Sequence, residues 1–360
     1  EGVGHLVDSA AVEGDAPEVL HALGLGELVR LGISSDRGLV ALAALWAASW
    51  QFDFDFRDMP LVSQLLGGAQ RAAWGFVGDH GAISVALAAI VMLALLWILL
   101  RALSVVIAIV SFYGFRLERH GRRIISEAGL LTRTRAGATP NRIQRVTVRQ
   151  SWLLKRMRRV SVQVTLAGGS SQGNEKETRL RWLAPIATVA DAQRILAGVR
   201  PDADWLRDDW RPLHPRAAWR MFKWPALFVV LGVSALGLVN PLFLWAWLVL
   251  PWLWIEARGR AKFGGYAMDG ETFAVRAGWL GRSWDSVRLR DIQSVRFRQT
   301  PGDRRQGMAR VAAASAGSSD LVGSPVEVAC LAADEASALC DRLREVASRA
   351  GAELGVAALL

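Results

Sequence analysis

Residues that carry chemistry are scarce in this sequence. It has only two cysteines, Cys330 and Cys340, among 360 residues. Both lie near a predicted helix, and two residues ten positions apart on a helix cannot form a disulfide bond. The scarcity of cysteine therefore argues against a disulfide-stapled domain. It is typical of a reducing compartment, where we expect two free, buried thiols.

Histidine is also scarce, and the five histidines never stand at the spacing of metal ligands. The sequence has no glycine-rich phosphate loop followed by Lys and Ser or Thr, and no Gly-x-Ser-x-Gly turn. Asp53, Asp55 and Asp58 lack the glutamate that closes an EF-hand loop, so we interpret them as an exposed connector. These absences predict a protein without catalytic residues, metal or cofactor, which is therefore not an enzyme.

Apolar residues, in contrast, are abundant. They make up 52% of the chain, and the mean hydropathy of +0.24 indicates membrane segments. Residues 82–100 carry no charge, which predicts a transmembrane helix over about 82–104 with Arg101 reaching the inner interface. Residues 38–50 form a shorter uncharged run. If this helix continues to about residue 54, it forms a transmembrane helix pair with the first one, within residues 36–112. A re-entrant or interfacial helix is the alternative for this run.

A second apolar stretch is interrupted by Asn240-Pro241, a dipeptide that favours a turn. We predict a transmembrane hairpin over 222–257, with helices at about 222–239 and 242–256; one kinked span is the alternative. Basic residues flank both ends: Arg216, Arg220, Lys223, Arg258, Arg260 and Lys262. Because cytoplasmic flanks are rich in Lys and Arg, both ends are predicted to lie inside and the Asn240 turn outside.

A long internal repeat organises the rest of the chain. Residues 121–169 match residues 270–318 at an offset of 149 positions without a gap. The matches include Gly121 with Gly270, Ile143-Gln144 with Ile292-Gln293, and Arg149-Gln150 with Arg298-Gln299. We expect the repeated glutamines to form strand-edge or turn hydrogen bonds. A repeat with so long a period indicates two copies of a whole domain.

Each copy is predicted to be rich in β-strands. Residues 145–149, 160–166 and 294–298 alternate between apolar and polar side chains, the pattern of half-buried antiparallel strands. Residues 189–199 and 336–347 then show the 3, 4 and 7 spacing of amphipathic helices. Each copy should therefore be a small β domain closed by a C-terminal helix.

At these repeated residues the chain resembles the bacterial PH-like domains of YdbT-type membrane proteins. The resemblance implies two PH-like β-barrel or sandwich domains, each closed by a C-terminal α-helix, alternating with pairs of transmembrane helices. It also implies a non-enzymatic protein of the bacterial plasma membrane, linked in some relatives to envelope stress or to tolerance of antimicrobial peptides. A smaller PH-like membrane protein is the partner that we would expect from it.

The predicted domains follow from the repeat and the apolar runs. We expect residues 1–35 to be the tail of a truncated preceding PH-like domain, with a helix from Pro17 to Leu31, or alternatively a plain N-terminal helix. The PH-like domains are placed at 113–200 and 258–350, followed by a tail at 351–360. A linker at 201–221 carries Trp205, Trp210 and Trp219, which suit a membrane interface.

The net charge of +10 allows either nucleic acid or an anionic membrane surface as a partner. We predict the cytoplasmic leaflet, because basic clusters beside membrane spans gain energy from anionic lipid, although a merely solvated basic face is the alternative. The candidate residues for anionic lipid or an acidic partner are Arg142, Arg145, Arg149, Arg156, Arg159, Arg288, Arg290, Arg296, Arg298 and Arg305.

Two other function classes are less well supported by the sequence. A nucleic-acid binder would need aromatic stacking platforms among the basic strands, and the membrane spans already explain the basic excess. A component of a membrane transport or export complex would need polar residues within the spans, and few are present beyond Arg101 and Asn240. We therefore favour a membrane-anchored binding or scaffolding protein with cytoplasmic PH-like domains, and keep the transport component as the alternative.

Overall fold

A computed structural model describes residues 18–35, 38, 40, 43–44, 47, 64, 82–167, 180–239, 241–315 and 325–357. The chain divides into two compact units. The first comprises residues 1–22, 116–127 and 135–360, and the second residues 23–115 and 128–134. Most of the predicted first span and the predicted turn at Asn240 lie outside the described residues.

In the second unit, helix α1 (Leu25–Ser34) packs against the long helix α4 (Ala82–Phe112). The helices touch at Gly32, where an added Cβ would lie 2.3 Å from the Cα of Val105. The guanidinium of Arg101 donates to the carbonyls of Ile33 (3.1 Å) and Ser35 (2.8 Å) at the C-terminus of α1. Arg101 thus satisfies carbonyls that a helix end leaves without an internal partner, a role that the sequence did not predict.

One helix among the described residues is long and apolar enough to cross a membrane by length and composition. It is the part of α4 from Ile90 to Phe112, and only 6% of its most apolar window is buried against the rest of the chain. Its position agrees with the predicted span at 82–104.

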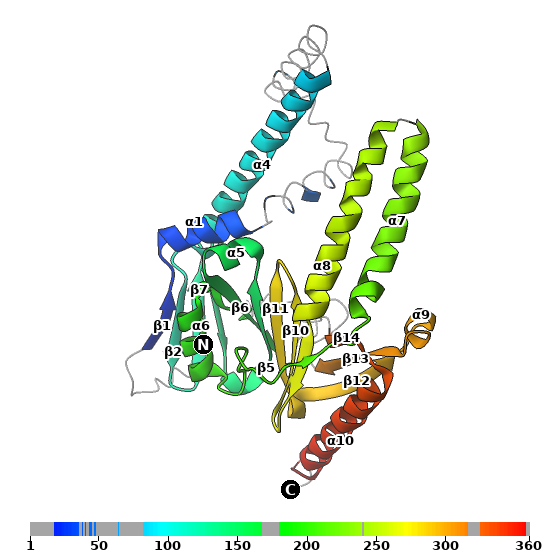
Figure 1. Ribbon diagram of the computed structural model, residues 1–360. Helices are drawn as coiled ribbons and strands as arrows, with labels where there is room; N and C mark the ends of the chain where they lie inside the picture. The colour runs from blue at the N-terminus through cyan, green and yellow to red at the C-terminus, as the bar shows by residue number, and fades with distance from the viewer. Residues whose placement is uncertain are drawn as a thin grey trace, which may run out of the picture. The chain divides into compact units, whose positions relative to one another are not determined.

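The first unit contains three antiparallel sheets, drawn in Figure 1. A four-stranded sheet has the order β1 (Glu18–Ala22), β2 (Arg116–His120), β3 (Arg123–Ala128) and β4 (Thr134–Ala138). A seven-stranded sheet has the order β7 (Trp182–Thr188), β6 (Arg159–Leu166), β5 (Ile143–Gln150), β11 (Arg282–Arg288), β10 (Thr272–Gly278), β9 (Gly265–Met268) and β8 (Arg211–Pro212). A three-stranded sheet has the order β12 (Ile292–Arg298), β13 (Met308–Ser315) and β14 (Val326–Ala332).

The repeat is confirmed element by element. Strands β2 to β6 and the short helices η2 (Pro140–Arg142) and α5 (Trp152–Arg156) correspond to β9 to β13, η4 (Leu289–Asp291) and α9 (Pro301–Arg304). Gly129 and its equivalent Gly278 both adopt a positive φ in the turn before β4 or β11. The predicted glutamine bonds recur too: Gln150 donates to the carbonyl of Arg159 and Gln299 to that of Met308.

A helix follows the last strand of each copy, as predicted. Helix α6 (Val189–Val199) begins at Thr188, whose hydroxyl caps the backbone N–H of Asp191. Helix α10 (Ala333–Ala357) packs Leu339, Cys340 and Leu343 into the core of the second copy. The two cysteines are free and buried, but Cys330 lies on strand β14 and not on the helix.

The first strand of each copy comes before an inserted helical segment. Strand β1 pairs with β2, although residues 23–115 separate them, and β8 pairs with β9 across residues 213–264. His21 of β1 also contacts the carbonyl of Ile186 in β7 at 3.0 Å. The N-terminal segment therefore differs from the prediction in one respect: the expected helix from Pro17 begins only at Leu25, and Glu18–Ala22 is a strand of the first copy's sheet.

The second inserted segment is a helical hairpin, as the sequence predicts. Helix α7 (Ala217–Val239) ends just before Asn240, and the short helix η3 (Pro241–Leu248) continues into α8 (Val249–Phe263). The two arms contact each other along their length (Figure 1). At the base of the hairpin, Gly259 of α8 lies so close to Trp279 that a Cβ would be 2.3 Å from its ring.

The two copies build their cores on opposite faces of the shared seven-stranded sheet. Val287 and Arg145 stand directly opposite each other and so project from the same face. Val287 belongs to the core of the second copy. Val146 and Val148 alternate with Arg145, so they project from the other face, where they are buried. The repeated domains are thus joined edge to edge in one continuous sheet.

Candidate functional site

The junction between the copies is the ladder between β5 and β11, which pairs residues 145–150 with residues 282–287. Asp285 accepts three hydrogen bonds there on one carboxylate oxygen. Arg145 donates from Nε at 3.0 Å and from Nη2 at 2.7 Å, and the hydroxyl of Thr147 donates at 2.6 Å. Both charged side chains are largely buried, so the ion pair fixes which strands meet and in which register.

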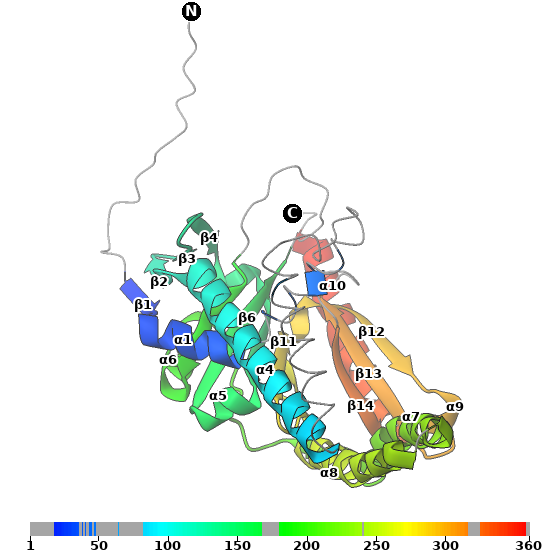
Figure 2. The ribbon, with the colours of Figure 1, turned by 90° about the horizontal axis from the view of Figure 1, so that it is seen from above.

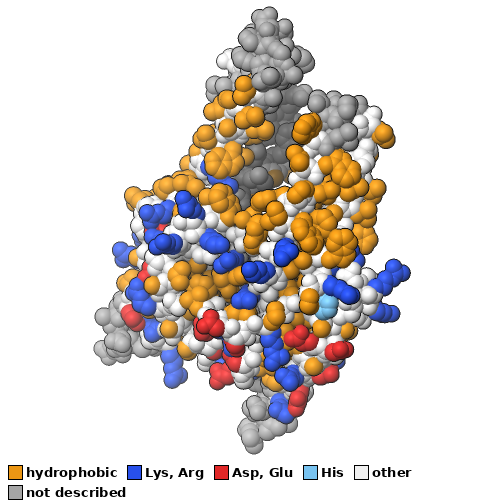
Figure 3. All heavy atoms as spheres, in the orientation of Figure 1, with side chains coloured by type: hydrophobic (Ala, Val, Ile, Leu, Met, Phe, Trp, Pro, Cys, Tyr) orange, Lys and Arg blue, Asp and Glu red, His pale blue; other side chains and the backbone are white. Residues whose placement is uncertain are grey.

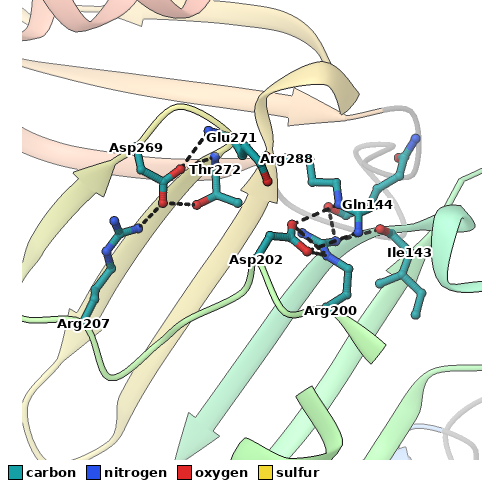
Figure 4. A network of polar contacts seen from close by, with 9 residues as sticks. All are labelled: Ile143, Gln144, Arg200, Asp202, Arg207, Asp269, Glu271, Thr272 and Arg288. Atoms are coloured by element: carbon teal, nitrogen blue, oxygen red, sulfur yellow. Dashed lines mark hydrogen bonds and ion pairs between the residues drawn. The ribbon is translucent and has the colours of Figure 1, made fainter. Parts of the chain in front are cut away.

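A second polar cluster closes one end of the junction (Figure 4). Arg200, at the end of α6, is fully buried and donates to both oxygens of Asp202 and to the carbonyl of Ile143 at 2.7 Å. Arg288 of β11 donates to the same carboxylate at 3.0 and 3.2 Å. Asp202 therefore lies between one arginine of each copy. Burial alone would raise the pKa of Asp202, but the hydrogen bonds from Arg288 and Arg200 hold it well below its usual range.

The predicted linker is an ordered strap, defined here as residues 200–212, that runs along the second copy. Trp205 is buried and meets Trp284 edge to face, with ring centroids 5.0 Å apart. Arg207 pairs with Asp209 at 2.6 Å. It also pairs with Asp269 at 3.0 Å (Figure 4). The sequence predicted that Trp205 would lie at a membrane interface. It is instead a buried core residue of the junction. Trp219 on α7 is exposed, as that prediction requires.

Two of the predicted arginines belong to the junction. Arg145 and Arg288 form the ion pairs with Asp285 and Asp202, and their side chains are only 16% and 13% exposed. Neither is presented to a membrane or an acidic partner in the way that the sequence analysis assumed. Arg159 of β6 is half-buried, and exposed Arg142 contacts the carbonyl of Ala167 at 3.4 Å. The other predicted arginines are exposed: Arg149, Arg156, Arg290, Arg296, Arg298 and Arg305.

Four exposed arginines of the second copy, on β12 and α9, are named here the basic edge: Arg296, Arg298, Arg304 and Arg305. Arg220 at the start of α7 forms an ion pair with buried Asp303 of α9, which also completes the capping box of that helix with Thr300. This contact brings α9 and the end of β12 to the base of the hairpin. On the face shown in Figure 3, apolar side chains cover the hairpin, and Lys and Arg side chains lie below them.

A small cavity of about 210 Å³ lies elsewhere in the second copy. Arg211, Tyr266, Glu335 and Arg342 contribute to its lining. The hydroxyl of Tyr266 donates to Glu335 at 2.6 Å; burial, reinforced by this carboxylate, raises the pKa of Tyr266 to about 12. The cavity is lined by side chains of both signs, the arginines and Glu335, and Glu335 already accepts a hydrogen bond from Tyr266. The cavity is therefore a weaker candidate site for an anionic ligand than the basic edge.

A family model described as bacterial PH domain matches residues 61–201 and 226–347. The chain belongs to the bacterial PH domain family. Its PH copies are β-rich regions of a kind that generally binds lipids or proteins without catalysis. No curated protein and no solved structure gives a significant match.

Sequence reasoning missed the carboxylates Asp202 and Asp285, and it assigned Arg145 and Arg288 to lipid or partner binding instead of to the junction. At Arg145, Asp285 and Arg288 the two PH copies differ. At the offset of 149, Arg145 corresponds to Ser294, Asp285 to Ala136 and Arg288 to Thr139. The repeat was detected from the positions that both copies share. The residues that form ion pairs across the junction are not repeated in the other copy. Only a comparison of positions at which the two copies differ could have identified them.

Replacement of Arg145 by Gln should lower the free energy of unfolding by about 2 to 3 kcal/mol, because it leaves the largely buried Asp285 without its cation. Arg149→Gln, four residues along the same strand but exposed, should change it by less than ~0.5 kcal/mol. Thermal and denaturant unfolding of the detergent-solubilised chain would measure both. Equal effects of the two substitutions would contradict the assigned role of Arg145.

The low pKa of Asp202 predicts a loss of stability in acid. A carboxylate with a depressed folded-state pKa contributes stability above its unfolded value near ~4, and this contribution is lost as the pH falls through the folded-state value. Asp202→Asn should therefore melt well below the parent at pH 7, and the gap should narrow as the pH falls below about 4 and close only as the pH passes the folded-state pKa. Asp204→Asn, an exposed change in the same strap, should parallel the parent at every pH; a constant gap for Asp202→Asn would refute the linkage.

Proposed function

We propose that this bacterial PH domain protein is a non-enzymatic, membrane-anchored module that binds or scaffolds at the cytoplasmic face of the plasma membrane. Helix α4 and the α7–α8 hairpin are the membrane anchors in this proposal. The two PH copies, joined through their common sheet, present the basic edge to the anionic leaflet. Envelope stress or tolerance of antimicrobial peptides is the physiological setting suggested by the resemblance to YdbT-type proteins.

The observation that carries the proposal is the pairing of the strands on either side of each inserted segment. Strands β1 and β2 are hydrogen-bonded neighbours, and so are β8 and β9. Neighbouring strands lie about 4.8 Å apart, whereas a bilayer core is about 30 Å thick. Each inserted segment must therefore leave and return on the same side, so it can cross a membrane only an even number of times. The α7–α8 hairpin meets this condition by itself.

The outer surface of the hairpin also supports the proposal. It exposes large apolar side chains on both arms, including Phe228 (72% exposed), Leu238 (91%) and Trp245 (72%). An exposed apolar surface over two adjacent helices is costly in water and is expected where lipid is the solvent. Arg216, Arg258, Arg260 and Lys262 near the two ends of the hairpin favour the cytoplasmic side for the PH copies.

Distance from the hairpin separates the arginines of the second copy into two groups. Arg304 and Arg305 adjoin α9, which the Arg220–Asp303 ion pair holds against the start of α7. Arg290 lies in η4, just before the other end of β12. This strand has 7 residues, which at about 3.3 Å per residue places Arg290 roughly 23 Å from the end of β12 that adjoins α9. The Debye length is about 8 Å at physiological salt, so Arg290 should gain little from lipid charge.

The alternative, a component of a transport or export complex, gains no support from the described part of α4. Its polar side chains Arg101 and Ser104 contact the α1 segment and the backbone of Gly38, and so complete a local helix packing. We therefore propose binding or scaffolding as the function.

The topology can be tested by labelling single cysteines with a membrane-impermeant maleimide. Asn240→Cys should react in intact cells, because the hairpin turn lies outside in this proposal. Gln293→Cys, exposed on β12, should react only after the membrane is permeabilised. Unmodified chain is the control, since Cys330 and Cys340 are buried and burial raises the pKa of both thiols. Reaction of both positions in intact cells would overturn the proposed orientation.

Lipid contact can be tested by the thermal stabilisation that anionic lipid gives to the detergent-solubilised chain. Replacing Arg298 and Arg305 together by Gln should remove about 2 kcal/mol of lipid attraction, at roughly 1 kcal/mol per charge. The stabilisation by phosphatidylglycerol should therefore shrink, and the difference from the parent should vanish at high salt. Arg290→Gln is the matched control and should respond like the parent. If the double variant also keeps the full effect at low salt, the basic edge is only a solvated face.

A further inference from the structure

Strand β12 is an edge strand although its equivalent in the first PH copy is not. Strand β5 pairs with β6 on one side and with β11 on the other, whereas in the described part of the chain β12 pairs with β13 alone. Strand β11, the partner of β5 at the junction, differs from its own equivalent in the same way. It pairs with β10 and β5, whereas its equivalent β4 pairs only with β3 among the described strands. Figure 2 shows β12 at the outer margin of its sheet. Among the described strands, one edge of β12 and one edge of β4 therefore have no neighbour.

Side-chain exposure shows what the missing neighbour would cover. Val148 of β5 is 1% exposed beside β11, whereas Phe297, which occupies the equivalent position in β12, is 40% exposed. Thr147 is buried at the junction, and its equivalent Arg296 is exposed. A large aromatic side chain on an unpaired strand edge marks this edge as a surface for strand addition.

We propose that β12 of one molecule pairs antiparallel with β4 of a second copy of this chain, in the register that β5 and β11 already use. In that register Val148 faces Trp284 and Thr147 faces Asp285. At the repeat offset of 149, Phe297 then faces Arg135, and Arg296 faces Ala136. The proposal rests on the repeat and the strand order, and is independent of lipid binding by the basic edge.

The residues brought together in this register are compatible. Arg298 would face Thr134, so no arginine stands directly opposite another in spite of the basic character of both strands. Arg135 is exposed and pairs with Glu127 at 2.9 Å. In this register its guanidinium lies opposite the ring of Phe297, a cation–π pairing of the kind that the chain already makes between Arg282 and Phe263 at 4.5 Å. The small residues Ala136, Gly137 and Ala138 leave room for the approaching strand.

The contact is head-to-tail, because β12 and β4 are different surfaces of one molecule. Such an interface leaves a free β12 at one end and a free β4 at the other, so it extends into rows unless a ring closes. Confinement to a membrane would favour it by raising the effective concentration of the two edges. A scaffold built from repeated copies is thus a consequence of the same ladder that joins the two copies within one chain.

The test is disulfide cross-linking of the full chain reconstituted in vesicles of neutral phosphatidylcholine. Mixing the variants Arg135→Cys and Phe297→Cys should give a covalent dimer on mild oxidation. Mixing Phe297→Cys with Thr134→Cys is the register control, because residue 134 projects from the other face and should give far less dimer. A chain that carries both Arg135→Cys and Phe297→Cys should form a ladder of higher oligomers.

Two results would overturn the proposal. One is a dimer yield no greater than that of the Thr134→Cys control; the other is dimerisation of Phe297→Cys with itself, which would indicate a two-fold contact between β12 strands. If a cysteine variant does not fold, the mass of the unsubstituted chain as a function of concentration decides the matter. It should show association that Phe297→Ser weakens about fivefold, the loss of one aromatic cross-strand contact, and a single-chain mass throughout would reject the idea. Because the vesicles are neutral, either rejection leaves the lipid proposal intact.

Discussion

The pairing of β5 with β11 is the constraint on which the arrangement of this protein depends. It joins strands of the two repeated domains into one sheet, and each domain builds its core on a different face of that sheet. A ladder of backbone hydrogen bonds is not selective by itself, since a shift of register would keep many of the bonds. The selectivity comes from Asp285, which accepts from Arg145 and Thr147 in one register only. The buried Arg200 and the strap then hold the end of the ladder through Asp202.

A second constraint links the second PH copy to the hairpin. The hairpin is inserted between β8 and β9, which are neighbours in one sheet, so both of its ends start from the same sheet edge. At the hairpin this link is reinforced by the Arg220–Asp303 ion pair and by the close contact of Gly259 with Trp279. A domain on a flexible linker would sample many distances from the hairpin. Here the end of β12 is held at the hairpin base, which makes position along that strand a measure of distance from the hairpin.

Much of the fold could be predicted from the sequence, because the signals that define it are local or repeated. Alternation at 145–149 and 294–298 marked two strands, and the dipeptide Asn240-Pro241 marked the end of α7. Strand β1 could not be found in this way. Its five residues have no alternating pattern, and their partner β2 begins 94 positions after β1 ends. Only the tertiary fold makes Glu18–Ala22 a strand, so a local reading extended the following helix backwards into it.

The candidate site shows the opposite limit of sequence reasoning. Sequence pattern identified ten arginines as one class because they share charge and a place in the repeat, yet the structure divides them by what lies beside their strands. Arg145 lies on a central strand and is held by the carboxylate of its neighbour, whereas Arg296 and Arg298 lie on an edge strand with no neighbour among the described residues. Charge alone therefore does not assign a role to an arginine in this fold. The role of an arginine depends on whether a second strand lies beside its own strand. In a repeat, that neighbouring strand can be present in one copy and absent in the described part of the other.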